Sequence, residues 1–358
     1  MHILNSLRLI GTSDGIFNNF KQYRTMISKY FKIIFFLIPL AIIFQDCQRG
    51  KVKIGFLLDD FSSERWYRDR DLFIRDAEQL GGKIMVDSAM GDVKKQFEQA
   101  KTMLESGVDV LVIVPANSEA AAAIVKLAHR YEVPVISYDR LIQNCDLDYY
   151  VSFENTNVGE LMSDYLSKRC PVGNYAVICG PASDNNSRLL KLGQMQVIQP
   201  YIEKGDINVI YDDCVDEWSS EEGYRHMIKC LDLGVKVDAV LCGNDALAQG
   251  VIRALKEKGL AGEVLVSGQD AETAAIQNIM AGYQTMTVYK PIEAIADASA
   301  RVAIKLGRGE PITEAYHTTY NGQKMVQSIL LDAMVVNRDN INMTVVAEGY
   351  LKQHNLND

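Results

Sequence analysis

The chain has 358 residues, of which 48% are hydrophobic and 23% are charged, and its formal net charge is −9. This is a globular composition, with apolar material for about two domains of roughly 150 residues each. The negative charge argues against a nucleic-acid-binding face. The five histidines are scattered, and no His-x-x-x-His or Cys-x-x-Cys spacing occurs, so we expect no metal centre and no cofactor.

Residues 1–47 are typical of an export leader. An unbroken apolar run over residues 33–44 follows basic residues, and Cys47 comes shortly after it. The run is shorter than the roughly 20 residues that span a bilayer, but it fits the apolar region of a secretory signal. We expect an exported protein that is anchored in the membrane through a lipid on Cys47. A natural start at Met26 would make residues 1–25 a gene-model extension, and a short anchor that is never cleaved is the alternative.

Six further cysteines follow the leader. Cys179 and Cys242 lie in apolar strand segments, where a free cysteine is a small buried residue. The others lie nearer to loops and helix ends: Cys145, Cys170, Cys214 and Cys230. An exported protein could pair some of these cysteines, but their spacing is not that of a small disulfide scaffold, so we assign no disulfide.

From Lys51 the chain alternates predicted strands and helices. Strands are predicted at 51–58, 82–89, 108–116, 133–139 and 149–155. Helices are predicted at 64–82, 93–107, 118–132 and 157–168. The strands are continuous apolar runs rather than alternating ones, which is typical of a parallel sheet that helices cover on both faces.

The same alternation restarts after about residue 170. Strands are predicted at 173–181, 207–215, 237–245, 262–270 and 283–290. Helices are predicted at 187–205, 219–234, 246–260, 271–282 and 291–308, before a less regular tail. The sequence therefore predicts an α/β protein of two doubly wound parallel-sheet lobes. No low-complexity linker separates them, so the junction near residues 153–157 is expected to be a short hinge.

Polar side chains follow nearly every predicted strand. Such sheets bind ligands at the carboxyl ends of their strands. After the first strand come Asp59, Asp60, Glu64, Arg65 and Trp66, after the third comes Asn117, and after the fourth come Asp139 and Arg140. In the second half the strands are followed by Asp184, Asn185 and Asn186, by Asp216, Glu217 and Trp218, by Asn244 and Asp245, by Gln269 and Asp270, and by Lys290.

This set of side chains suits a sugar. Carboxylates, amides and guanidinium groups can each bind two adjacent hydroxyls, and an aromatic ring can pack on the apolar face of a pyranose. Simpler interpretations exist for each residue taken alone. Asp245 before a helix could be an N-cap, Asp139 and Arg140 could be a solvated ion pair, and Trp66 could belong wholly to the core. The recurrence at one end of each strand favours the sugar site.

Enzymatic functions have weaker support. The segment after the first strand has no Gly-x-Gly-x-x-Gly motif, and the chain has no Walker A motif and no Gly-x-Ser-x-Gly elbow. Paired carboxylates such as Asp139 and Asp270 leave a glycosidase as the alternative. Two equal lobes with a short hinge favour a protein that closes on its ligand, so we predict that the chain is not an enzyme.

Several longer strings resemble the periplasmic D-xylose-binding proteins of ABC transporters, in the ribose/galactose class of substrate-binding proteins. They include KIGFLLDDFSSERWYRDRD, VDVLVIVPAN, YDRLI, VSFENTNVGEL, GPASDNN, GNDALAQG and SGQDAETAAIQNIMAGYQTMTVYKPI. The resemblance runs from about residue 51 to about 309. It implies the type I periplasmic binding protein fold with three hinge crossings, an N-lobe of 51–154 plus about 291–320, and a C-lobe of 155–289 plus part of the tail.

The resemblance also implies the ligand, the contacts and the partners. The N-lobe contacts would be Arg65, Asp139 and Arg140, the C-lobe contacts would be Asn186, Asn244 and Asp270, with Lys290 at a hinge, and Trp66 and Trp218 would lie on or beside the ring. The sugar would be D-xylose or another pentose or hexose. The partner would be the permease of an ABC transporter, or alternatively a sensor histidine kinase.

We expect the unliganded protein to be mostly open. The physical reason is that a closed, empty cleft would bury Asp139, Arg140 and Asp270 without full pairing, which is costly. The sugar would supply the missing hydrogen bonds and shift the population toward the closed state.

Overall fold

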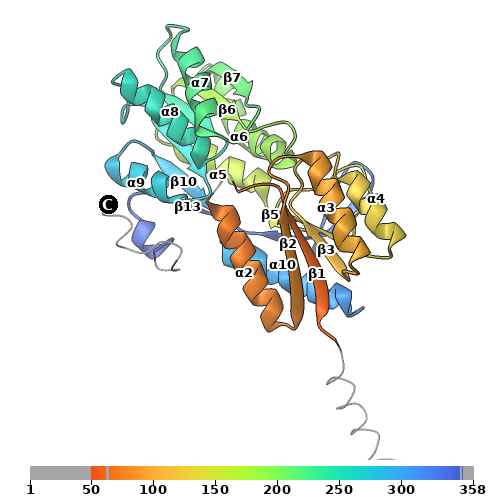
Figure 1. Ribbon diagram of the computed structural model, residues 1–358. Helices are drawn as coiled ribbons and strands as arrows, with labels where there is room; N and C mark the ends of the chain where they lie inside the picture. Colours follow the sequence, from red (N-terminus) through yellow and green to blue (C-terminus); the bar gives the residue numbers. More distant parts are fainter. Residues whose placement is uncertain (1–49, 62–63, 347–348, 350–358) are drawn as a thin grey trace, which may run out of the picture. The chain divides into compact units, whose positions relative to one another are not determined.

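A computed structural model describes residues 50–61, 64–346 and 349 of the chain. The leader region, with the predicted lipidation site Cys47, lies outside these residues. The chain divides into the units Met1–Lys51 and Val52–Asp358, and the fold below is that of the second unit. It contains two β-sheets flanked by helices (Figure 1).

The first sheet has seven strands in the order β11-β12-β5-β4-β3-β1-β2. All neighbouring strands are parallel except β11 and β12, which form an antiparallel pair. The strands are β1 (Val52–Leu58), β2 (Gly82–Ser88), β3 (Val110–Ile113), β4 (Val135–Tyr138), β5 (Tyr149–Phe153), β11 (His317–Tyr320) and β12 (Met325–Leu331).

The second sheet has six strands in the order β13-β10-β9-β8-β6-β7, parallel except for the β13–β10 pair. The strands are β6 (Gly173–Cys179), β7 (Ile207–Cys214), β8 (Ala239–Cys242), β9 (Leu265–Gln269), β10 (Met286–Tyr289) and β13 (Met334–Val336).

Helices cover both faces of each sheet, as the apolar strands predict. In the first lobe α2 and α10 pack on one face and α3 and α4 on the other; in the second, α5 and α6 lie opposite α7 and α8. The helices are α2 (Arg65–Gln79), α3 (Val93–Glu105), α4 (Ala122–Arg130), α5 (Asn155–Ser167), α6 (Asn185–Lys204), α7 (Ser220–Leu231), α8 (Asp245–Glu257), α9 (Thr273–Ala281), α10 (Ile292–Gly307) and the 3₁₀ turn η1 (Ile341–Met343). The predicted fold class is confirmed.

The chain passes between the two sheets three times. It leaves the first sheet after β5, returns between β10 and α10, and leaves again between β12 and β13. The three crossings that the resemblance implied are therefore present. The returning piece of the first lobe extends past residue 320 to Leu331, because β12 pairs in parallel with β5.

The structure contains a disulfide, a pairing that the sequence left unassigned. Cys179 ends β6 and Cys214 ends β7, and their sulfurs are bonded with the Cα atoms 4.5 Å apart. The two strands are parallel neighbours whose register places these two residues opposite each other. The remaining cysteines among the described residues are free: Cys145, Cys170, Cys230 and Cys242.

Within the part of the chain that the structure describes, no helix has the length and apolar character needed to cross a membrane.

Candidate functional site

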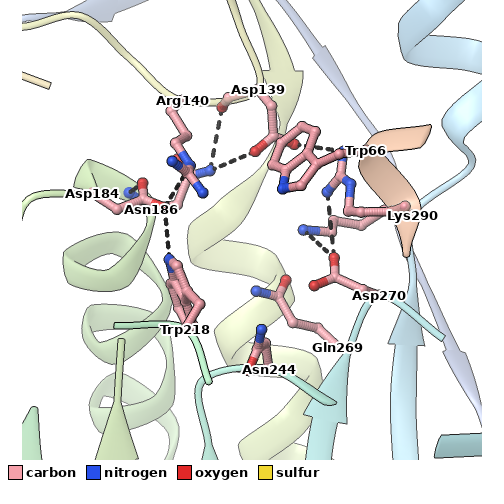
Figure 2. Close-up of a pocket in the computed structure, with 11 residues that line it drawn as sticks. Trp66, Asp139, Arg140, Asp184, Asn186, Trp218, Asn244, Gln269, Asp270 and Lys290 are labelled. Atoms are coloured by element: carbon pink, nitrogen blue, oxygen red, sulfur yellow. Dashed lines mark hydrogen bonds and ion pairs between the residues drawn. The ribbon is translucent and has the colours of Figure 1, made fainter. Parts of the chain in front are cut away.

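One cavity lies where the strand ends of the two sheets face each other (Figure 2). Its empty volume is about 410 Å³, counting the solvent at its mouth. Its lining consists of Arg65, Trp66, Asp139, Arg140, Asp184, Asn186, Trp218, Asn244, Gln269, Asp270 and Lys290. All nine residues that the sequence proposed as sugar contacts are among them, together with Asp184 and Gln269.

Arg65 is the most extensively paired cation of the cavity. Its Nη2 lies 2.9 Å from the Asp139 carboxylate, and its Nη1 lies 3.3 Å from the Asp270 carboxylate. Asp139 belongs to the first lobe and Asp270 to the second, so Arg65 links the two lobes directly. Asp69, one helical turn further along α2, holds the remaining side of the guanidinium through Nε at 3.1 Å.

Arg140 makes a second link between the lobes. Its Nη1 donates to Asp59 at the end of β1, at 2.5 Å, and its Nε lies 2.9 Å from the Asp184 carboxylate in the second lobe. The Trp218 indole N–H donates to the same carboxylate of Asp184 at 3.2 Å. Asp139 and Arg140, neighbours in sequence, thus pair with different partners.

Asp270 and Lys290 form a pair beside the second crossing. Lys290 follows β10, and its Nζ lies 2.7 Å from the Asp270 carboxylate. Both groups are almost fully buried. The pair gives the cavity a carboxylate and an ammonium group at the hinge end.

Amide side chains complete the polar wall. Asn186 donates through Nδ2 to the Asp139 carboxylate at 3.1 Å and accepts from Asn155 at the same distance. Its neighbour Asn185 bonds instead to Gln143, away from the lining set. Asn244 has two roles, because its Oδ1 caps α8 through the Leu247 N–H at 2.9 Å while the residue lines the cavity.

The structure therefore assigns the cap of α8 to Asn244 rather than to Asp245. Asp245 is fully buried and accepts hydrogen bonds from Gln284, Thr287 and the backbone N–H of Glu272.

The two tryptophans approach the cavity from different lobes (Figure 2). Trp66 belongs to the first-lobe core, and the guanidinium groups of Arg65 and Arg140 lie 4.5 and 5.4 Å from its ring centroid. Trp66 is thus both a core residue and part of the lining. The ring of Trp218 occupies the space beside Gly180, where a Cβ would come within 2.0 Å of it.

Gln269 and Asp184 also line the cavity, although neither is among the predicted sugar contacts. Gln269 is 4% exposed and directly precedes Asp270. Its Oε1 is buried without a hydrogen-bond partner among the described residues. Gln269 is the last residue of β9, and Asp184 is the N-cap of α6 in the loop that follows β6. Their location after strands is the signal that could have included them.

The charged groups of the cavity shift the pKa values of the aspartates beside them. Burial has the largest effect on the Asp139 carboxyl and would raise its pKa, but Arg65, Lys290 and Arg140 together bring the pKa below its ordinary value. At Asp184 the effect of burial exceeds that of Arg140, and its pKa lies above the ordinary value. Asp139 is therefore a permanently charged hydrogen-bond acceptor at neutral pH.

One premise of the closure hypothesis is wrong. Asp139, Arg140 and Asp270 were expected to lack full pairing when the lobes are together, but each is ion-paired with protein groups. The reason is that each acid of the cavity has a cation within reach, including partners from the opposite lobe. That the unliganded protein is mostly open stays a prediction.

The chain can be compared with known proteins. It is 45% identical to the D-xylose-binding periplasmic protein of Escherichia coli (strain K12), over 86% of this chain and 93% of that one. It is 44% identical to the protein of the same name from Haemophilus influenzae, over 88% and 95%. A carbohydrate transporter solute-binding protein from Chloroflexus aurantiacus, solved with D-glucose, has a TM-score of 0.79 at 27% identity, over 86% and 98%.

The family model described as "Periplasmic binding protein domain" matches residues 54–311, which include every residue that lines the cavity, whereas β11, β12 and β13 follow the matched range. With the two-lobed fold and the two curated relatives, this match identifies the chain as a member of the periplasmic binding protein family.

Proposed function

We propose that this chain is an exported monosaccharide-binding protein with D-xylose as its ligand. In this proposal the two lobes close on the sugar in the periplasm and deliver it to the membrane component of an ABC transporter. One observation carries the proposal: side chains from the strand ends of both lobes line one cavity with three cations, carboxylates, amides and two tryptophans. The high identity to two D-xylose-binding relatives supports the choice of sugar.

The chemistry of the lining suits adjacent hydroxyls. Each sugar hydroxyl can donate one hydrogen bond and accept two. Arg65, Arg140 and Lys290 supply donors, whereas Asp139 and Asp270 supply charged acceptors, and hydrogen bonds to charged groups are the stronger ones. The Gln269 amide adds a buried acceptor that has no hydrogen-bond partner among the residues that the structure describes. In this proposal the lining binds the ligand and performs no bond cleavage.

Tryptophan fluorescence offers a direct test of the ligand class. Trp66 and Trp218 are the only tryptophans of the chain, and both line the cavity. D-xylose is expected to change the emission in a saturable manner at lower concentrations than D-ribose, D-glucose or L-arabinose do. A stronger response to one of the other sugars would replace D-xylose as the ligand, and no saturable response to any of them would contradict the proposal.

The transporter partner and the anchor need separate tests. Crosslinking of the sugar-loaded protein in native membranes is expected to capture a transporter membrane component. Capture of a sensor histidine kinase instead would contradict the proposed transporter partner.

We also propose that Cys47 carries a lipid. Mass spectrometry of the native N-terminus is expected to find a diacylglyceryl group on it, and Cys47→Ser is expected to release the protein from membranes.

A further inference from the structure

Asp69 is fully buried and lies outside the set of residues that line the cavity. It sits on α2, four residues after Arg65, so the two side chains share a face of the helix. Its two carboxylate oxygens accept from Nε and Nη2 of Arg65 at 3.1 and 3.3 Å. This is the two-pronged arrangement that fixes the plane of a guanidinium group.

Tyr138 in turn holds Asp69. It is the last residue of β4 and directly precedes Asp139. Its hydroxyl donates to Oδ1 of Asp69 at 2.5 Å, and its buried ring packs against Phe56 and Phe73. Burial raises the pKa of the Tyr138 hydroxyl well above its ordinary value, so the hydroxyl keeps its proton and serves as a donor.

These contacts determine which N–H groups of Arg65 remain for the cavity. A guanidinium group has five N–H donors. Asp69 takes one from Nε and one from Nη2, so the second Nη2 proton faces Asp139 and Nη1 faces Asp270. Asp69, Tyr138 and Asp139 all belong to the first lobe. The orientation of Arg65 is therefore set within that lobe, before any contact with the second lobe is made.

We propose that Asp69 and Tyr138 are positioning residues, which raise the affinity for the sugar by fixing the Arg65 guanidinium without contacting the sugar themselves. A preorganised side chain loses less conformational freedom when it binds, and the gain appears as affinity. The inference rests on the proposed function, because it requires that Arg65 binds the ligand.

The first test is Tyr138→Phe, which removes one hydroxyl and keeps the ring in the core. The expected result is an affinity for D-xylose about tenfold weaker, because Asp69 loses the bond that holds it and the Arg65 guanidinium is less well fixed before the sugar binds. Tyr175→Phe is the matched control. Tyr175 is a fully buried tyrosine of the second lobe, its hydroxyl donates to the Cys170 carbonyl at 2.8 Å, and it lies outside the lining set. Calorimetry is expected to show less than a twofold change for this control.

The second test asks whether the effect acts through Arg65. In an Arg65→Lys background the two-pronged contact with Asp69 cannot form, so adding Tyr138→Phe is expected to change the affinity less than twofold. The same loss in both backgrounds would show a general structural effect and overturn the proposal. If Arg65→Lys binds too weakly to measure, the comparison of Tyr138→Phe with Tyr175→Phe decides.

Different results would contradict the proposed sugar binding and the proposed positioning role of Asp69 and Tyr138. Absence of sugar binding by the unmodified protein would contradict the proposed function itself. Normal binding by the unmodified protein and by Tyr138→Phe alike would leave the proposed function in place and overturn the positioning role. Asp69→Asn gives an independent check, because it keeps the side-chain volume and is expected to weaken binding at least as much as Tyr138→Phe does.

Discussion

Asp139 and Asp270 occupy equivalent positions in the two lobes. Each follows the last residue of a central parallel strand, β4 or β9, and each has a left-handed backbone, with φ of 62° and 96°. Each donates its backbone N–H to a carbonyl of the next strand, Val151 or Val288, at 2.8 Å. Both carboxylates meet at Arg65. Non-glycine residues with positive φ are uncommon and concentrate at functional sites.

The Asp139 carboxylate is expected to be essential for binding. Asp139→Asn keeps a residue type that tolerates left-handed backbone but removes the charge that pairs with Arg65. Loss of one partner of a buried ion pair is expected to weaken the affinity for D-xylose about a hundredfold. Calorimetry measures it, with the exposed Asp87→Asn of the same lobe as control. Unchanged affinity in Asp139→Asn would show that the carboxylate is no sugar contact.

The position of the Trp218 ring in the cavity lining requires a glycine at position 180. A Cβ at Gly180 would lie 2.0 Å from the Trp218 ring, so Gly180→Ala is expected to displace the indole, shift its fluorescence and weaken sugar binding at least about tenfold. Gly55→Ala is the control, because its Cβ would instead meet the side chains of Leu111 and Met103 in the first lobe. Normal emission and affinity in Gly180→Ala would show that the position of the Trp218 ring does not depend on this glycine.

The Cys179–Cys214 disulfide is expected to stabilise the second lobe. It closes a loop with a sequence separation of 35, for which the chain-entropy model gives roughly 3–4 kcal/mol. Reductant should therefore lower the thermal midpoint of the unmodified protein and of Cys170→Ser, whose mutated cysteine is free. It should have no effect on the double variant Cys179→Ser/Cys214→Ser. A midpoint that reductant leaves unchanged would argue against the bond.

The pH dependence of stability follows from the lowered pKa of Asp139. An aspartate with a folded-state pKa below its unfolded value, about 3.9, contributes stability that is complete above the unfolded pKa and lost as the pH falls through the folded one. The stability difference between the unmodified protein and Asp139→Asn should be constant above about pH 5 and shrink below about pH 4. Chemical denaturation across this range measures it. A difference that grows on acidification would contradict the direction of the shift.

The sequence was sufficient for the lobes and for much of the cavity lining. Continuous apolar runs indicate parallel strands, and the rule that ligands bind at strand ends indicates Asn244 and Asp245 together with Gln269 and Asp270. The resemblance to the D-xylose-binding proteins then implies Asn244 and Asp270 as the contacts. The tail was harder, because β11 and β13 are short and β11 is mostly exposed. Such segments carry too little apolar periodicity to be separated from loops.

The missed features depend on contacts between distant segments. The pairing of Cys179 with Cys214 requires knowing that β6 and β7 are adjacent and in what register. Asp69 and Arg65 have the sequence spacing of an ordinary surface ion pair on a helix. Only the fold shows that both are buried and that Tyr138, at the end of β4, donates a hydrogen bond to Asp69. The third partner of Arg65, Asp270, comes from the other lobe.

Calorimetric titration with D-xylose is the most direct test of sugar binding in the cavity. We expect saturable binding of one sugar per chain. We also expect that Asp139→Asn and Asp270→Asn, whose carboxylates come from opposite lobes, each weaken the binding strongly. No binding of D-xylose, D-ribose, D-glucose or L-arabinose at millimolar concentration would contradict the proposed function.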